Sequence, residues 1–446
     1  MRLVEASKGF LVLASLFFYA WWNVAYLPLL LGSMLFNYTV GRELVKRTSK
    51  VLLGVGVGVN IALLGYFKYM DFFIINYNRL VENDLPLLHL ALPLAISFYT
   101  FQQIAYLVDS YRGETKEYDF LNYAVFVSFF PQLIAGPIVH HKEMMPQFAK
   151  LKNKVANYHN IALGLFIFSM GLFKKVVIAD TFAVWATKGF DVATTLNMLE
   201  AWFTSLSYTF QLYFDFSGYA DMAIGLALLF NIKIPINFYS PYKATSIQDF
   251  WRRWHMTLSR FLKDYIYIPL GGNRKGEMRT YTNLFATFVL GGIWHGAGWT
   301  FVFWGVLHGG ALVVHRVWQK LGFKMHSVLA WFITFNFINI TWVFFRAINF
   351  ESAIKVLKGI FMGQFVLPAG VGVDLQMQMS WSKLYTTDTY LYLWMIVAFL
   401  MVLVLPNSMQ WMKKFKLNFF YLTLTVLFFM SLFLLHRKSE FIYFNF

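Results

Sequence analysis

The sequence predicts an all-α polytopic membrane protein, and three observations support this fold class. Hydrophobic residues make up 58% of the 446 residues and only 13% are charged, whereas soluble domains are nearer a quarter charged. Apolar runs of about 20 residues, long enough to cross the hydrocarbon core as a helix, follow one another too closely for soluble domains to fit between them. Lipid cannot satisfy exposed backbone groups, so each run is expected to be helical.

The chain is therefore expected to form one membrane domain over residues 1–446, ending in a last helix and an aromatic tail at 417–446. About eleven runs are long enough to be candidate spans. The clearest, in chain order, lie at 10–35, 51–75, 86–108, 159–180, 198–230, 281–299, 300–317, 327–346, 390–405 and 417–436.

Two further apolar runs do not fit a pattern in which each run crosses the membrane once and successive loops lie on alternate sides. The run at 119–139 holds two prolines and precedes a basic loop, and the run at 246–270 interleaves aromatic residues with Arg and Lys. The first is expected to be re-entrant or interfacial, and the second to be an interfacial amphipathic segment. Irregular backbone at membrane depth is tolerated where it lines a cavity. The chain is therefore expected to fold around an internal chamber.

Charge predicts the orientation and excludes some classes of protein. The chain has 38 Lys and Arg against 22 Asp and Glu, a net charge of +16, which is typical of basic cytoplasmic loops facing anionic lipid. These residues are dispersed among apolar runs, so no nucleic-acid partner is predicted.

Without cysteine there are no disulfides or thiolate metal sites, and no metal site is predicted. The expected cytoplasmic loops are 41–50, 233–279, 315–324 and 411–416, and the expected outer segments are 82–84, 191–200 and 363–390.

His295 is the first candidate catalytic residue. It lies in "GGIWHGAGW" (291–299), within a stretch, 281–310, that contains no Asp, Glu, Lys or Arg. A titratable residue at membrane depth is costly and by default indicates function. The alternative is a neutral histidine bonded to a carbonyl, with the glycines permitting close helix packing. His308 lies roughly 20 Å away along a straight helix, so it joins His295 only if the glycines break the helix. We expect His308 to be structural and His315 to be a loop residue.

His255 lies in "QDFWRRWHMTLSRFLKDYIYIPLGGNRKG" (248–276), a segment rich in Arg and Lys. One interpretation is a cationic mouth for a polyanionic donor, because Arg and Lys hold phosphates. The other, favoured by charge alone, is a surface helix that binds lipid headgroups. "GGNRKG" lacks the spacing of a phosphate-binding loop. "GVGVGV" (54–59) lacks the strand, turn and helix of a dinucleotide site, so helix packing explains it better.

Two other features allow a functional and a structural interpretation. Asp215 and Asp221 lie in the apolar run "QLYFDFSGYADMAIG" (211–225), where structural ion pairing is favoured over acid–base chemistry. The chain ends in "EFIYFNF" (440–446), which would ordinarily be an interfacial aromatic belt. A terminus with this much apolar surface is also expected to pack against the rest of the protein.

Together these motifs resemble the membrane-bound O-acyltransferase family in its alginate O-acetylation branch. Those that carry the resemblance, over most of residues 15–350, are "FYAWW", "LGYFKY", "SFYTFQ", "LVDSYRG", "FFPQLIAGPI", "KKVVIADTFA", "QLYFDFSGYADMAIG", "FWRRWHMTLSRFLKDYIYIPLGGNRKG" and "GGIWHGAGWTFVFWG". The resemblance implies a ring of about 10–12 transmembrane helices, with re-entrant and interfacial helices, around a thinned central cavity. Alginate-type relatives begin with an extra hydrophobic helix ahead of "FYAWW", so that span is expected to be missing here or to begin differently.

The resemblance also assigns the site. His295 in "WHG" corresponds to the invariant histidine of the family, and His255 in "RRWH" to its second, less strict position. Both are expected to be catalytic. The expected substrate-binding residues are Arg252, Arg253, Lys263 and Trp294. "FIYFNF" resembles the aromatic end of the companion membrane peptide in D-alanylation systems, whose tyrosine is proposed to carry the acyl group, and this role falls on Tyr443.

The implied function is acetyl transfer from cytoplasmic acetyl-CoA, a substrate rather than a tightly bound cofactor, across the bacterial inner membrane to an envelope polysaccharide. Peptidoglycan is favoured as the acceptor, ahead of alginate or another exopolysaccharide and of D-alanyl transfer. The chain shows no soluble domain for the last step, so a secreted or periplasmic partner of the SGNH hydrolase type is expected. The rival classes are a transporter or proton-coupled channel, which would spread charged side chains along a pathway, and a scaffold, which needs no buried histidine.

Overall fold

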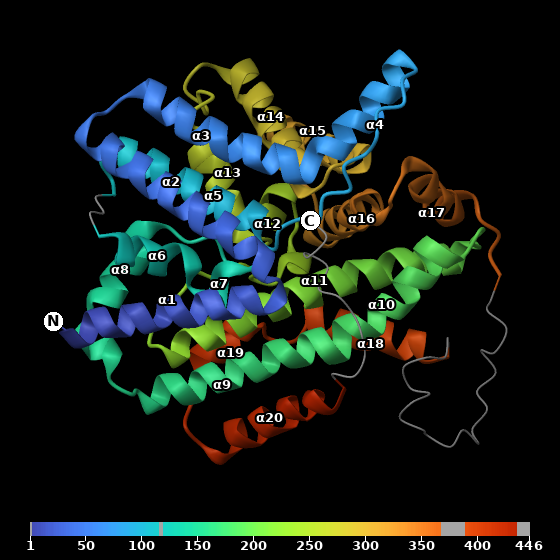
Figure 1. Ribbon diagram of the computed structural model, residues 1–446. Helices are drawn as coiled ribbons and strands as arrows, with labels where there is room; N and C mark the ends of the chain where they lie inside the picture. Colours follow the sequence, from blue (N-terminus) through green and yellow to red (C-terminus); the bar gives the residue numbers. More distant parts are fainter. Residues whose placement is uncertain (1, 116–118, 367–388, 435–446) are drawn as a thin grey trace.

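The computed structural model describes residues 2–115, 119–366 and 389–434, and every regular element in these ranges is a helix (Figure 1). The predicted all-α fold class is therefore confirmed for this part of the chain. The ring arrangement and the single domain over residues 1–446 stay predictions.

The first expected span, 10–35, is wrong as one helix. α1 (Arg2–Trp22) is separated from α2 (Leu27–Lys46) by a 3₁₀ turn, η1 (Val24–Tyr26). The Asn23 side chain caps this turn by accepting a hydrogen bond of 2.9 Å from the Ala25 N–H. A proline follows in the first turn of α2, where its missing N–H costs little. Local capping therefore divides a run that is apolar throughout.

The next segment contains both a long helix and broken ones. α3 (Lys50–Leu64) continues through the π turn η2 (Gly65–Tyr69) into α4 (Met70–Val81). The expected span 86–108 is shorter in the structure, because the helix begins only at α5 (Ile96–Tyr111). The run 119–139 is broken as expected, into α6 (Phe120–Ser128) and α7 (Phe130–Leu133), and α8 (His141–Ala149) follows.

The central helices pack closely because small residues face one another. α9 (Tyr158–Phe173) continues through η4 (Lys174–Ala179), α10 (Asp180–Thr187) and η5 (Lys188–Val192), and α11 (Met198–Leu229) runs back along it. A Cβ atom on Gly171 would lie 2.5 Å from the Gly218 carbonyl oxygen, and one on Gly225 would lie 2.6 Å from that of Gly164. These contacts require glycine, because any side chain would push the two backbones apart.

Ion pairs also join η4 with α10 and α11. Lys174 lies 2.6 Å from Asp221, and Lys175 lies 2.7 Å from Asp215 and 2.8 Å from Asp180. Asp215 and Asp221 are buried. The favoured interpretation of these two carboxylates as structural is therefore supported, with lysine as the partner.

The rest of the chain alternates short and long helices. In chain order they are α12 (Ile247–Trp251), α13 (Met256–Leu262), η7 (Lys263–Tyr267), α14 (Glu277–His295), α15 (Trp299–Lys320), α16 (Ser327–Arg346), α17 (Phe350–Met362), α18 (Thr389–Leu403), α19 (Ser408–Lys414), α20 (Phe419–Phe429) and η9 (Met430–Leu434). The run 246–270, expected to resemble an interfacial amphipathic helix, is instead a series of short elements.

The number of spans, expected to be about ten to twelve, stays a prediction. Five helical stretches are long and apolar enough to cross a membrane, or six if the bent pair Tyr390–Leu403 and Ser408–Lys414 forms one span. The five are Val24–Lys46, Lys50–Val81, Tyr158–Val192, Trp299–Lys320 and Ser327–Arg346. Other apolar runs form shorter or more polar helices. α5, for example, buries Ser97, Gln102 and Asp109 inside the protein.

Two of the basic segments and two of the basic-poor segments lie on opposite sides of the structure, and the orientation in the membrane stays a prediction. In Figure 1 the connection between α2 and α3 and the start of α20 lie on the left, next to the basic segments 41–50 and 411–416. The ends of α4 and η5, next to the basic-poor segments 82–84 and 191–200, lie on the right. α20 runs from the first side toward the second (Figure 1).

Replacing Gly171 with alanine is expected to destabilise the fold. The new methyl group would overlap the α11 backbone, and overpacking of this kind costs about 1–3 kcal/mol of the free energy of unfolding. Thermal unfolding of the detergent-purified protein measures the loss. The matched control is Gly58→Ala on α3, where the added carbon meets no atom within 4 Å. An equal fall in Tm for both variants would contradict the close α9–α11 contact.

Candidate active site

His295 lies at the point where α14 ends inside the protein. Gly296 and Gly298 are both extended, with φ of −162°, and α15 starts at Trp299. A Cβ atom on Gly292 would lie 2.4 Å from the Phe301 carbonyl oxygen, and one on Gly296 would lie 2.2 Å from the Phe301 ring. The glycines therefore break the helix after His295 and let α15 pack back against α14.

Two side chains from another span hold this helix end. The Lys68 ammonium donates hydrogen bonds to the carbonyl oxygens of Trp294, at 2.6 Å, and of His295, at 3.1 Å. The Tyr69 hydroxyl donates to the carbonyl of Ile293 at 2.7 Å. The last carbonyls of a helix lack partners within the helix and carry a partial negative charge. A cation and a hydroxyl from η2 therefore stabilise the backbone on which His295 is mounted.

Sequence reasoning missed both of these residues. "LGYFKY" contributed only to the family resemblance, although a lysine inside an apolar span is itself an indication of function. Lys68 and the carbonyl oxygen that it caps on His295 are 227 positions apart in the chain. Nothing in a single sequence indicates that pairing.

The His295 ring is surrounded by aromatic side chains. It is 3% exposed, and its centroid lies 4.8 Å from that of Trp294, 5.1 Å from Trp304 and 5.0 Å from Phe345. The Trp294 ring in turn stacks on Phe101 at 4.7 Å. Trp294, predicted to bind substrate, thus lies directly beside His295, and its role stays a prediction. Trp304 and Phe345 were not singled out from the sequence.

The helix break also brings His308 back toward His295. Both histidine rings contact Trp304, and the ring centroids of His308 and Trp304 are 4.5 Å apart. The Trp251 indole N–H donates to His308 Nδ1 at 3.1 Å, and His308 Nε2 lies 3.1 Å from the Thr341 hydroxyl. That hydroxyl donates to the Ile338 carbonyl, so it accepts from Nε2. His308 is therefore a neutral histidine with both nitrogens bonded, which supports the predicted structural role.

His255 is completely buried at the start of α13, with a left-handed φ of 41°. Its Nδ1 lies 3.3 Å from the Asn237 side-chain oxygen, and the Asn237 carbonyl accepts from the Met256 N–H. Burial lowers the pKa of His255 to about 3. The contact with an acceptor oxygen places the proton on Nδ1. It leaves Nε2 as a buried acceptor for which the described part of the chain offers no partner.

The two predicted catalytic histidines are brought near each other. His255, His308 and Lys68 are all close enough to influence the His295 side chain electrostatically. His255 itself packs its ring edge-on against Phe216 at 4.8 Å. A candidate site therefore combines a histidine at the end of α14 with a second histidine at the start of α13.

The predicted donor-binding cations lie on the segment that carries His255. Arg252 and Lys263 are exposed, and neither has an ion pair among the residues that the structure describes. Arg253 is partly buried and bonded to Asp249 at 2.9 Å. Arg252 and Lys263 are thus better placed than Arg253 to bind an external anion.

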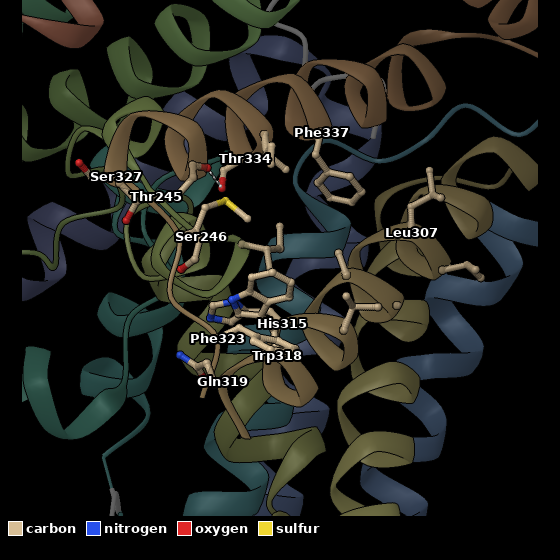
Figure 2. Close-up of a pocket in the computed structure, with 18 residues that line it drawn as sticks. Thr245, Ser246, Leu307, His315, Trp318, Gln319, Phe323, Ser327, Thr334 and Phe337 are labelled. Carbon is tan, nitrogen blue, oxygen red and sulfur yellow. Dashed lines mark hydrogen bonds between the residues drawn. The ribbon is translucent and has the colours of Figure 1, made fainter. Parts of the chain in front are cut away.

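A cavity of about 860 Å³ lies between α15 and α16, next to this region. Figure 2 shows His315, Trp318 and Phe323 gathered together, with Leu307 and Phe337 farther along the two helices. His315 was expected in a loop, which is wrong, because α15 extends to Lys320. The Arg252 charge acts on His315, and the Phe337 ring also contacts His308 at 5.6 Å. The cavity therefore borders the candidate site, although neither catalytic histidine lines it.

The remaining predicted catalytic residue, Tyr443, lies outside the described residues, as does the rest of the "EFIYFNF" motif. Its role stays a prediction.

Comparison with known proteins identifies a family and several relatives. Residues 59–354 match the model of the membrane-bound O-acyltransferase family. A peptidoglycan O-acetyltransferase of Helicobacter pylori is 60% identical over 386 residues, which is 79% of this chain and 73% of that protein. A probable alginate O-acetylase of Pseudomonas putida is 43% identical over 366 residues, 79% of this chain and 74% of that protein.

A more distant relative is a teichoic acid D-alanyltransferase of Streptococcus thermophilus, which is 27% identical over 286 residues, 56% of this chain and 68% of that protein. The family match covers the whole of α14, with His295 at its end, the segment that carries His255, and Lys68. This chain therefore belongs to the membrane-bound O-acyltransferase family.

Proposed function

We propose that this chain transfers acetyl groups for the O-acetylation of an envelope polysaccharide, and that the polysaccharide is peptidoglycan. The observation that carries the proposal is the buried His295 at the broken end of α14, mounted on a backbone that Lys68 and Tyr69 hold in place. The 60% identity to a protein named peptidoglycan O-acetyltransferase supports this acceptor over alginate, whose probable acetylase is 43% identical. Transfer of D-alanine ranks third, at 27%.

The proposed donor is cytoplasmic acetyl-CoA, in a protein of the bacterial inner membrane. Two features support it. Arg252 and Lys263 are exposed cations without an ion partner in the described ranges, and Arg and Lys hold phosphates well. They also belong to 233–279, one of the basic segments expected on the cytoplasmic side. The donor's phosphates would stay at this surface while its thioester reaches His295.

In the proposed chemistry His295 acts as a general base on the acceptor hydroxyl. The proposed acceptor is Tyr443, which would carry the acetyl group to the outer side. An unperturbed phenol has a pKa of about 10 and imidazole one of about 6.5, so complete proton transfer would be uphill by almost 5 kcal/mol at about 1.36 kcal/mol per pKa unit. Proton removal is therefore concerted with attack on the thioester. His255, which lies close enough to influence His295 electrostatically, is the second proposed catalytic group.

An aryl ester remains a good acyl donor, because phenolate leaves more readily than a sugar alkoxide. A secreted or periplasmic partner of the SGNH hydrolase type would accept the acetyl group from Tyr443 and pass it to the sugar. Such a partner would perform the last step outside the membrane.

The described charges favour an enzyme over the transporter class. A transporter is expected to spread ionisable side chains along a pathway. Here Lys174 and Lys175 of η4 form ion pairs with Asp221 and Asp215 of α11, between packed helices. His295 lies instead among aromatic rings.

His295→Gln is expected to abolish acetyl transfer from radiolabelled acetyl-CoA, with a fall of about 10²–10⁴-fold, the range typical for loss of a general base. Glutamine retains polarity and much of the volume at a packed position. The control is His326→Gln, an exposed histidine at the start of α16. Wild-type transfer by folded His295→Gln protein would contradict the assignment. Solute flux that does not depend on acetyl-CoA would favour the transporter.

Charge reversal at Arg252 or Lys263 is expected to raise the KM for acetyl-CoA more than that for a short uncharged acetyl thioester. The difference arises because only acetyl-CoA carries phosphates. Arg253→Glu should have a weaker donor-specific effect, since Asp249 already pairs with that side chain. Lys358→Glu, at an exposed position of α17, is the control for net charge. Equal losses with both donors would point to lipid binding or folding damage instead.

Tyr443→Phe is expected to stop transfer to the partner and to remove an acetyl-tyrosine adduct from the C-terminal peptide, as read by mass spectrometry. The change keeps the ring and deletes only the nucleophilic oxygen. If this variant acetylates the envelope as well as the parent does, Tyr443 is an interfacial anchor. His295 then acts directly on a hydroxyl of the partner.

A further inference from the structure

The aromatic cluster around His295 contains buried indole N–H groups that have no acceptor. Trp294, Trp304 and Trp342 are 6%, 1% and 1% exposed, and the Nε1 atom of each lacks a hydrogen-bond partner in the part of the chain that the structure describes. Trp294 and Trp304 contact the His295 ring, whereas Trp342 stacks on Trp304 at 5.8 Å. A buried donor without an acceptor is costly, and such groups usually have an explanation in function.

The other donors that the structure shows near His295 already have acceptors. The Lys68 ammonium and the Tyr69 hydroxyl are bonded to carbonyls of α14. The Trp251 N–H is bonded to His308, and the Thr300 hydroxyl to the Ala347 carbonyl. The indole N–H groups of Trp294 and Trp304 belong to rings in contact with His295, and the described ranges supply no acceptor for either of them.

We propose that the indole N–H groups of Trp304 and Trp294 donate hydrogen bonds to the acyl carbonyl oxygen of the thioester and stabilise the negative charge that develops on it. The inference rests on the proposed acetyl transfer at His295. Charge development at this oxygen is what acyl transfer must stabilise, and donors fixed in a site that excludes water are effective because they need no reorganisation during the reaction.

The proposed step transfers the acyl group from the thioester sulfur to the oxygen of the acceptor hydroxyl. His295 takes the proton of the acceptor hydroxyl as the hydroxyl oxygen attacks the acyl carbon. The carbon–oxygen π pair moves onto the carbonyl oxygen, where the two N–H groups bind it. When the carbonyl re-forms, the carbon–sulfur bond breaks, and the thiolate takes the proton from His295. An ester and a free thiol result, with no change in oxidation state.

The test replaces each tryptophan, one at a time, with 3-benzothienylalanine, which keeps the fused rings and exchanges the N–H for sulfur. Position 304 is tested first, and position 294 second. The matched control is Trp185, which is also buried, at 5% exposed, and also lacks an acceptor for Nε1 in the described residues. Its ring packs on Phe182. Steady-state acetyl transfer and Tm without substrate are measured for each purified variant.

At position 304 we expect kcat to fall about 10²–10³-fold, the range for loss of one such donor, with little change in the KM for acetyl-CoA. Tm should stay constant or rise, because the change removes an unpaired buried N–H. Position 294 should behave in the same way. The control at position 185 should keep its kcat.

Three results would overturn the inference. The first is an unchanged kcat at positions 304 and 294. The second is a fall in Tm that parallels the loss of activity, which would mean that the N–H groups bond to another part of the chain. The third is an equal fall in kcat at position 185. If the 3-benzothienylalanine variant at position 304 does not accumulate, Trp304→Phe takes its place, and its steady-state acetyl transfer and its Tm without substrate are measured instead. His295→Gln tests the proposed acetyl transfer separately from the tryptophan donors. If folded His295→Gln protein keeps its activity, the proposed function fails; if it loses activity while the tryptophan variants keep theirs, only the present inference fails.

Discussion

The unsatisfied end of α14 is the constraint on which the site depends. A helix that stops inside the protein leaves several carbonyl oxygens without partners, and burial makes each of them costly. Lys68 and Tyr69 bond to the carbonyls of Ile293, Trp294 and His295. The cation also lies at the negative end of the helix dipole. With these bonds in place α14 can end at His295, and the glycines after it can turn the chain back into α15.

The central helices and the ring of His295 have different surroundings. Full charges among the central helices are paired, as in Lys174 with Asp221 and Lys175 with Asp215. The ring of His295 contacts tryptophan and phenylalanine, and the ring stack from Trp294 continues through Phe101 to Phe261 at 4.1 Å. Fixed dipoles act more strongly in such a poorly hydrated environment than they do in water. The scaffold uses ion pairs, whereas the site uses hydrogen bonds and aromatic packing.

The fold class could be predicted from the sequence, because composition alone indicates a helical membrane protein. "WHG" and "RRWH" pointed to His295 and His255 through the family resemblance, and the catalytic roles of these two residues stay predictions. The number of spans could not be read from hydropathy, because an apolar run does not reveal an internal cap such as Asn23 or buried polar groups such as those of α5. His315 was misplaced because its basic neighbours resemble a loop. Lys68 and Trp304 reach the site through tertiary packing alone.

The glycines after His295 shorten the distance between His295 and His308, because they break the helix between the two residues. On a straight helix His308 would lie roughly 20 Å from His295, too far for a shared site. Because α14 ends at His295 and α15 folds back, both rings contact Trp304. His308 is bonded at both nitrogens and therefore fixes its neighbours without titrating, while His295 keeps its ring among aromatic side chains. The same break that exposes carbonyls to Lys68 thus assembles a rigid, neutral wall beside the proposed base. The ring of His295 contacts Trp294, Trp304 and Phe345, and in the proposed step the imidazole holds the proton of the acceptor hydroxyl until the leaving thiolate takes it.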